Sequence, residues 1–292
     1  MRHDSPVARV GAAILSATVA CSVWGSEAAP VKEVFSDYQQ LLERHLEEQR
    51  TDNGGLVSAF DYEAALGDER TRGLLEDQSE RLAGFDVDTL ETREQSLAFW
   101  NNAYNYFMIH QILTEQVDGQ LVDSVWDYGG RYNPFMSSVF ELEKFEIGGS
   151  NYSLNEIEKG ILLGAEFEEK GWKEARVHFT VNCASVGCPP LREAIYTSDN
   201  IDELMSENTR LAFNTDRHLR VEGDTLHLTE LFKWYEDDFV DEGGSVRGFI
   251  SQWADEAVAE QVQQTDSIEY IDYDWALNRP ANFPALKGDE TR

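Results

Sequence analysis

The chain has 292 residues, of which 41% are hydrophobic and 11% aromatic, and its formal net charge at pH 7 is −31. This apolar content is enough for a packed core, which excludes global disorder, and the length suits one large domain or two small ones. So negative a surface repels nucleic-acid phosphates and anionic lipid headgroups, and we expect binding to neither. Because Asp and Glu are spread along the whole chain, we interpret the charge as a solvated surface and not as a field that steers cationic substrates or metal ions.

Residues 1–28 have the features of an export signal. Arg2 and Arg9 flank the start of an apolar run, VGAAILSATVACSVW, that is too short to span a bilayer comfortably, and small residues suitable for cleavage follow it. Within this run, TVAC loosely resembles a lipoprotein box without its usual Leu, so a lipid anchor at Cys21 is the alternative to simple cleavage. We expect a periplasmic or secreted protein with no other membrane attachment, in a compartment that permits disulfides.

Hydrophobic spacing predicts helices and hairpins without a regular strand–helix alternation, which favours an α+β (mixed α/β) fold. We find no linker, so we expect a single compact domain over residues 29–280, with a small sheet packed by helices and a C-terminal tail at 281–292. The strongest helix begins with a capping-box pair, Thr92 and Gln95. In chain order the predicted elements are a helix at 34–50, an extended piece entering a helix at 55–66, a helix at 92–113, a hairpin at 139–154, a helical stretch at 155–175, a strand at 175–183, a helix at 201–215, a hairpin at 218–229 and a helix at 245–262.

The predicted strand at 175–183 has one apolar and one polar face. Because side chains alternate across a strand, His178, Thr180 and Asn182 share the polar face, while Cys183 lies on the apolar face. A polar face in a central strand packs against polar groups or lines a cleft. His178 is therefore the best single candidate for a general acid or base, and the alternative is a core histidine with satisfied hydrogen bonds.

The helix at 92–113 carries an unusual concentration of amides. Asn102 and Asn105 are three residues apart and share a face, with Tyr104 to one side of it. Asn at an interior helical position costs roughly 0.6 kcal/mol relative to Ala, so such amides either satisfy buried backbone groups or bind something. We expect this face to meet the polar face of His178 and Asn182 in one cluster, because two separate unsatisfied faces would cost several kcal/mol.

Two cysteines, Cys183 and Cys188, are separated by only four residues. A disulfide between them, worth roughly 2 kcal/mol on the chain-entropy model, is the favoured interpretation for an exported chain. A second possibility is a nucleophile at Cys188, which precedes two prolines that could open a helix. A shared metal ion with His178 is disfavoured because the strand alternation points His178 and Cys183 to opposite faces. We expect no metal and no cofactor.

Five segments resemble, in order, the signatures of the domain-of-unknown-function family numbered 547 (DUF547), over roughly residues 35–278. The resemblance implies no assigned activity, although some eukaryotic members join the domain to leucine-zipper, DEP or glutaredoxin-like regions. It adds Glu158 to the candidate site. The family usually has His where this chain has Lys159, so a catalytic role of that His in relatives would imply an altered or inactive site here. The five segments are LAFWNNAYNYFMIHQIL, YSLNEIEKGIL, VHFTVNCASVGCPPLR, LTELFKWYEDDF and YIDYDWALN.

Two functions from different classes remain open. The favoured one is a binding or scaffolding module with a polar His/Asn/Tyr cleft, because no complete catalytic triad can be written. The alternative is a hydrolase or transferase that uses His178 with Cys188 or Tyr104, in which case these groups lie within hydrogen-bond reach at the floor of an open cleft. The partner is an unidentified small molecule or protein.

Overall fold

The computed structural model describes residues 1, 29–131 and 136–286. The predicted signal segment 1–28 therefore lies almost wholly outside the described residues, together with the end of the predicted tail. Packing continues past residue 280, because a 3₁₀ turn at Pro280–Asn282 is followed by Phe283, which is buried. None of the described helices is both long and apolar enough to cross a membrane.

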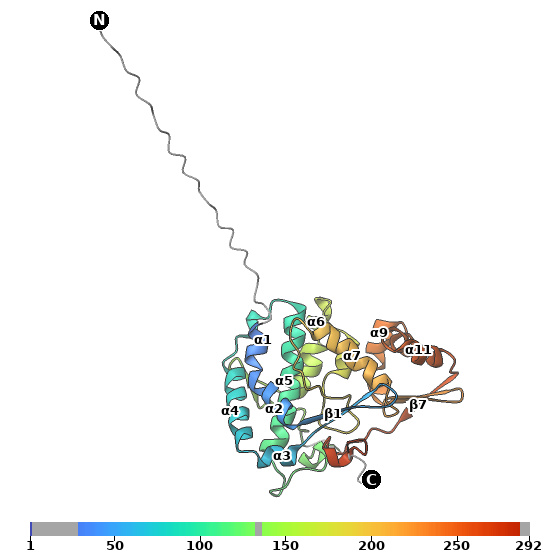
Figure 1. Ribbon diagram of the computed structural model, residues 1–292, viewed down its shortest axis with the longest axis horizontal. Helices are drawn as coiled ribbons and strands as arrows, with labels where there is room; N and C mark the ends of the chain where they lie inside the picture. Colours follow the sequence, from blue (N-terminus) through green and yellow to red (C-terminus); the bar gives the residue numbers. More distant parts are fainter. Residues whose placement is uncertain (2–28, 132–135, 287–292) are drawn as a thin grey trace.

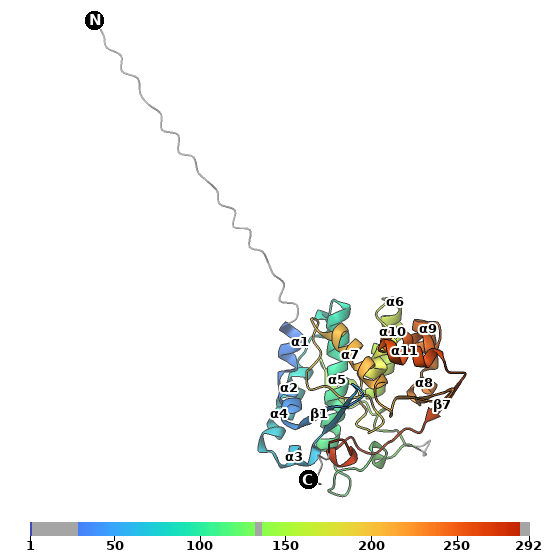
Figure 2. The ribbon, with the colours of Figure 1, turned by 45° about the vertical axis from the view of Figure 1, so that its right-hand side comes forward.

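One long helix, α5 (Arg93–Thr114), runs through the middle of the molecule (Figure 1). Almost all of its residues are buried, and its apolar side chains belong to one large hydrophobic cluster. The same cluster includes side chains from the N-terminal helices, which lie on one side of α5 in both ribbon views (Figure 2). These helices are α1 (Ala29–Val34), α2 (Ser36–His45), α3 (Tyr62–Gly67) and α4 (Glu69–Ala83).

A second, smaller core lies in the C-terminal half and is built around phenylalanine rings. The rings of Phe232 and Phe239 have centroids 4.4 Å apart, and Phe249 lies 4.8 Å from Phe239. Aromatic pairs at such distances add specific edge and stacking contacts to the burial of apolar area. The helices that contribute to this half are α7 (Ile201–Phe213), α8 (Leu231–Trp234), α9 (Glu236–Gly243), α10 (Val246–Trp253) and α11 (Glu256–Gln263).

The strands form three small sheets rather than one. The hairpins are antiparallel: β1 (Leu46–Arg50) with β2 (Leu56–Phe60), and β3 (Phe145–Ile147) with β4 (Ser150–Tyr152). The third sheet joins β5 (Leu219–Glu222) to β6 (Thr225–Thr229) in an antiparallel pair, and β7 (Ser267–Ile271) adds a parallel strand beside β6. The expected compact α+β fold is therefore confirmed, and both predicted hairpins are present.

Three predicted helices have different boundaries from those expected. The helix expected at 34–50 ends at His45, because residues 46–50 pair with β2 as strand β1. The helical stretch at 155–175 contains a π-helix, Glu156–Leu162, followed by the short α6 (Ala165–Glu169). Gly164 lies between the two helices. A side chain at this position would collide with the carbonyl oxygen of Gly160, so the close approach of the backbone requires glycine. The helix expected at 245–262 is likewise divided, because Ala254 is extended between α10 and α11.

The strand predicted at 175–183 is wrong. Residues Ala175–Phe179 form a 3₁₀ helix, and the chain after Thr180 is irregular. Its backbone bonds are local, because the N–H groups of Thr180 and Val181 both donate to the carbonyl of Val177. The alternation of apolar and polar residues arises here without a neighbouring strand.

We expect the Thr92→Ala substitution to lower the free energy of unfolding by about 1 kcal/mol, measured by urea denaturation. The Thr92 hydroxyl accepts from the Gln95 N–H, while the Gln95 side chain accepts from the Thr92 N–H, and the alanine variant loses this capping box. Thr92→Ser keeps the oxygen and should stay within a few tenths of a kcal/mol of wild type. Equal losses in the two variants would contradict the capping role.

Candidate functional site

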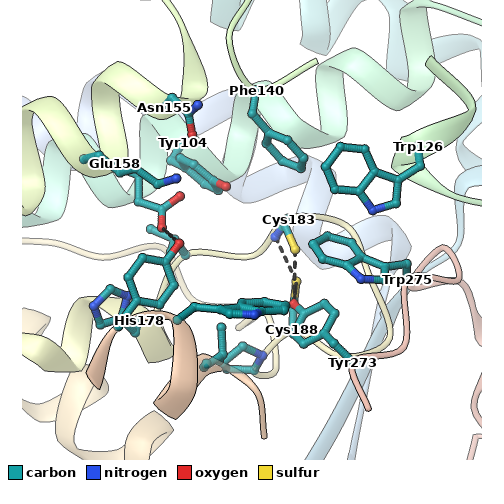
Figure 3. A pocket seen from close by; sticks show the side chains of 16 residues that line it. Tyr104, Trp126, Phe140, Asn155, Glu158, His178, Cys183, Cys188, Tyr273 and Trp275 are labelled. Carbon is teal, nitrogen blue, oxygen red and sulfur yellow. Dashed lines mark hydrogen bonds between the residues drawn. The ribbon is translucent and has the colours of Figure 1, made fainter. Parts of the chain in front are cut away.

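A cavity of about 340 Å³ lies where the central helix, the π-helix, the cysteine segment and the C-terminal segment meet (Figure 3). This volume is at the lower end of the range of small-molecule sites, roughly 300–1,000 Å³. Seven of the sixteen lining residues are Phe, Tyr or Trp, and charged, amide and thiol side chains lie among them. The lining residues are Tyr104, Trp126, Phe140, Asn155, Glu158, Lys159, His178, Val181, Cys183, Cys188, Pro189, Leu231, Trp234, Tyr235, Tyr273 and Trp275.

Asn105 of α5 holds the segment that leads into the cysteines. Its Nδ2 donates to the carbonyl of Thr180, and its Oδ1 accepts from the N–H of Asn182, both at 2.8 Å. Asn182 in turn donates from Nδ2 to the carbonyl of Pro189 at 2.8 Å and accepts at Oδ1 from the N–H of Ala184. These bonds tie both ends of the cysteine loop, residues 182–189, to a rigid helix.

The backbone of the cysteine loop turns sharply at Ala184, whose φ is +57°. A left-handed conformation at a non-glycine residue costs of order 1–2 kcal/mol and is maintained only where the surroundings fix it. The turn brings Cys188 back to Cys183, so that the Cys183 N–H donates to the Cys188 Sγ at 3.0 Å. The loop therefore places its two sulfur atoms at one point of the cavity floor (Figure 3).

Tyr273 contacts both sulfur atoms from the C-terminal segment. Its hydroxyl donates to the Cys188 Sγ at 3.1 Å and lies 3.3 Å from the Cys183 Sγ. The Tyr273 ring packs directly on Gly187, where a Cβ would lie 2.9 Å from the ring. The Gly187 N–H also donates to the carbonyl of Asp274 at 2.8 Å. Glycine is thus required at 187 for the tyrosine to reach the thiols.

The two cysteines differ in exposure and acidity. Both are free thiols in the structure, so the predicted Cys183–Cys188 disulfide stays a prediction. Cys183 is partly exposed, and hydrogen bonds from Cys188 and Tyr273 lower the pKa of its thiol. Cys188 is buried, and its burial and its bond to Cys183 raise the pKa of its thiol well above the usual value. No helix starts at Pro189 or Pro190, so the helix that these prolines could open after Cys188 is not formed.

His178 lines the cavity beside Tyr235, and among the described residues no hydrogen bond joins it to either thiol. Its ring stacks on Tyr235 with centroids 4.0 Å apart, and only 1% of its side chain is exposed. Its Nε2 donates to Oδ2 of Asp238 at 2.8 Å, while its buried Nδ1 has no hydrogen-bond partner among the described residues. The expected pairing of His178 with Cys188 or Tyr104 is therefore not formed.

Glu158 and Tyr104 supply the polar groups on the opposite side of the cavity from Tyr273 (Figure 3). The π-helix carries Glu158, whose Oε1 accepts from the Tyr235 hydroxyl at 2.9 Å. The Tyr104 hydroxyl points into the cavity (Figure 3), and burial, followed by the nearby Glu158 charge, raises its pKa well above the usual value. π-Helical turns are frequent at functional sites because they re-aim side chains.

The predicted single polar cluster is divided into three parts. Asn105 and the Thr180–Asn182 segment meet as expected. Asn102 instead pairs with the backbone of Tyr196, donating to its carbonyl at 2.7 Å and accepting from its N–H at 2.9 Å. His178 pairs with Asp238. The division follows from the 3₁₀ turn, which does not alternate side chains as a strand would.

Some lining residues were not expected from the sequence. Tyr273 and Trp126 carry no pattern that singles them out, although Tyr273 lies in the quoted segment YIDYDWALN. Asp238 lies in the acidic run YEDDFVDEGG, where nothing distinguishes it from its neighbours. Within the part of the chain that the structure describes, no group of three or more His, Cys, Asp or Glu side chains could hold a metal ion.

Residues 87–211 match the family model described as "Protein of unknown function, DUF547". The family indicated by the sequence motifs is therefore confirmed for this part of the chain, which includes α5, the π-helix and the cysteine loop. The segments LTELFKWYEDDF and YIDYDWALN lie outside the matched residues. No curated protein and no solved structure matches the chain.

We expect Asn105→Ala to lower the free energy of unfolding by roughly 2 kcal/mol or more, because the Thr180 carbonyl and the Asn182 N–H would be left buried without partners. Urea denaturation measures the change. Asn151→Ala, at an exposed position of β4, is the matched control and should change stability by less than about 0.5 kcal/mol. A loss no larger at Asn105 than at Asn151 would rule out the tethering role.

The lowered pKa of Asp238 predicts that the stability of the fold decreases at acid pH. The hydrogen bond from His178 and the ion pair with Lys173 lower its pKa from 3.8 to about 2. A carboxyl whose pKa is lower in the folded than in the unfolded state stabilises the fold above pH 4 and loses that contribution as pH falls towards 2. The stability difference between wild type and Asp238→Asn should therefore shrink as pH falls from 4 to 2. A difference that does not vary with pH would contradict it.

Proposed function

We propose, for a chain whose residues 87–211 belong to the DUF547 family, that the aromatic cavity binds a small molecule and that Cys183 and Cys188 exchange disulfides with it. The observation that carries this proposal is the asymmetry of the thiol pair. Cys183 is the more exposed and more acidic thiol, and Cys188 is buried beside it with a raised pKa. An attacking thiolate and an adjacent resolving thiol are the two groups that disulfide exchange requires.

Disulfide exchange fits the site better than the hydrolase or transferase considered from the sequence. A cysteine hydrolase needs a base that takes the thiol proton and later protonates the leaving group. Among the described residues no histidine hydrogen-bonds to either thiol, and His178 is held by Asp238 and stacks on Tyr235. Exchange needs no such base, because the Cys183 thiolate is the reacting species.

The proposed reaction begins when the Cys183 thiolate attacks one sulfur of a substrate disulfide R–S–S–R. The substrate S–S bond breaks, one RS⁻ leaves, and a mixed disulfide forms between Cys183 and the other half. The Cys188 thiolate then attacks the Cys183 sulfur and expels the second RS⁻. The substrate disulfide gains two electrons, the protein dithiol loses them, and the two thiol protons end on the two product thiols.

Binding and export stay part of this proposal. The cavity replaces the polar cleft that the sequence predicted as the binding site, with Tyr104 and Glu158 among its polar groups. A periplasmic or secreted location supports the chemistry, because an oxidising compartment supplies disulfides. In such a compartment the resting form would carry the predicted Cys183–Cys188 disulfide, and the free thiols would be its reduced form.

We expect Cys188→Ser to trap a mixed disulfide when the reduced protein meets 2,2′-dithiodipyridine, a neutral disulfide that releases absorbing thiopyridone. In a Cys21→Ser background, wild type should release two thiopyridones per chain and end as the internal disulfide. Cys188→Ser should release one and keep the pyridylthio group on Cys183, as mass spectrometry would detect. Cys183→Ser should react at least about tenfold more slowly, because Cys188 is buried and less ionised.

The unfolded proteins provide the control, since each single-cysteine variant should react at the same rate in urea. A native wild type that keeps two pyridylthio groups per chain, with no internal disulfide, would show that Cys188 does not resolve. A faster reaction at Cys188 than at Cys183 would reverse the proposed roles.

A further inference from the structure

Glu158 is a buried carboxylate whose charge has no cationic partner. The residue is 8% exposed, and its only hydrogen bond among the described residues comes from the Tyr235 hydroxyl. No described Lys, Arg or His forms an ion pair with it within 4.0 Å, although Lys159 follows it in the chain and also lines the cavity. Buried charges in proteins are normally paired, so a ligand can supply the cationic partner that this carboxylate lacks.

The Glu158 charge acts on the acidic groups around it. Burial and then Glu158 raise the pKa of the Tyr104 and Tyr235 hydroxyls. Glu158 also opposes the ionisation of Cys183, whose pKa is nevertheless lowered by the hydrogen bonds from Cys188 and Tyr273. Glu158 therefore contributes a negative potential to the cavity, and a positive group placed there would lower the energy of the Glu158 carboxylate and of the Cys183 thiolate.

Four aromatic rings form a continuous wall of the same cavity. Trp275 lies at its centre, with ring centroids 4.6 Å from Tyr273, 5.0 Å from Trp126 and 5.8 Å from Trp234. The faces of Trp and Tyr rings attract cations. Two of these rings already contact a cation within the protein. The guanidinium of Arg131 lies 5.4 Å from the Trp126 centroid and 5.5 Å from the Trp275 centroid.

We propose that the cavity selects disulfides that carry a cationic group, which lies between Glu158 and the aromatic wall while the disulfide of the same molecule reaches Cys183. The selection rests on the proposed exchange function, whereas the cation site itself does not. An alkylammonium is the simplest group of this class, since it pairs with a carboxylate and also lies against aromatic faces. The substrate would then assist its own reaction, because its charge offsets the field of Glu158 at the attacking thiol.

Lys159 is the group that argues for the opposite charge preference. Its side chain is exposed and lines the cavity, so it could attract an anionic ligand. It makes no ion pair with Glu158, and outside the cavity its charge adds to the two Ser138 hydrogen bonds that mainly lower the pKa of Glu141. A buried carboxylate loses less of its field to water than an exposed ammonium does, which favours the cationic ligand.

The test compares two aliphatic disulfides of opposite charge, cystamine and 3,3′-dithiodipropionate, as oxidants of the reduced full-length protein. Each rate is divided by the rate of the same disulfide with the urea-unfolded chain, which removes differences in intrinsic reactivity. We expect native wild type to prefer cystamine by at least about tenfold, as one well-placed charge can provide. Glu158→Gln, which still accepts from Tyr235, should reduce this preference at least about fivefold.

The matched control is Glu156→Gln, on the exposed face of the same π-helix and outside the cavity. Glu156→Gln makes the same change in net charge and should keep the wild-type preference for cystamine. The comparison therefore separates the effect of the Glu158 carboxylate from the effect of the net charge of the protein. Equal normalised rates for the two disulfides, a preference for the anion, or equal effects of the two substitutions would overturn the inference.

Calorimetric titration with tetramethylammonium separates the cation site from the chemistry. Binding to wild type that is at least about tenfold weaker in Glu158→Gln supports the site, even if neither disulfide oxidises the protein and the exchange function fails. No binding to wild type, together with unreactive disulfides, would exclude the cation site and the exchange function alike.

Discussion

The paired hydrogen bonds of the Asn105 amide are the constraint on which the rest of the site depends. The segment after Phe179 has no neighbouring strand, so its buried backbone groups need side-chain partners. Asn105 satisfies one N–H and one carbonyl at once, at 2.8 Å each. Because Asn105 belongs to a helix that is buried along almost its whole length, the cysteine loop inherits the rigidity of the main core.

Two carboxylates on either side of the Tyr235–His178 stack have opposite environments. Asp238 accepts from His178 and pairs with Lys173, so its charge is balanced. Among the described residues, Glu158 accepts a hydrogen bond only from the Tyr235 hydroxyl. The stacked rings of Tyr235 and His178 separate the two acids, and both rings line the cavity. The role of His178 as a general acid or base stays a prediction, and its described contacts are with the Tyr235 ring and the Asp238 carboxylate.

Local sequence patterns predicted the regular elements well. The capping box at Thr92 and the hairpin β3–β4 depend only on neighbours in sequence, and both are present. The alternation at 175–183 misled because a strand is specified by its neighbour, and here the partners are side chains such as Asn105. The cavity could not be derived either, since the His178–Asp238 contact spans 60 residues and no local pattern marks it.

Assembly of the thiol site follows the order in which the chain is made. Tyr273 follows Cys188 by 85 residues, yet its hydroxyl contacts both sulfur atoms and its ring covers Gly187. Domains that fold during synthesis use only the part of the chain already available. The cysteine loop can settle on α5 early, but its thiols stay uncovered until the last part of the domain arrives. In a chain that folds during synthesis, the segment around Tyr273 would therefore be the last to reach the thiols, and its hydrogen bond would complete the lowering of the Cys183 pKa that Cys188 begins.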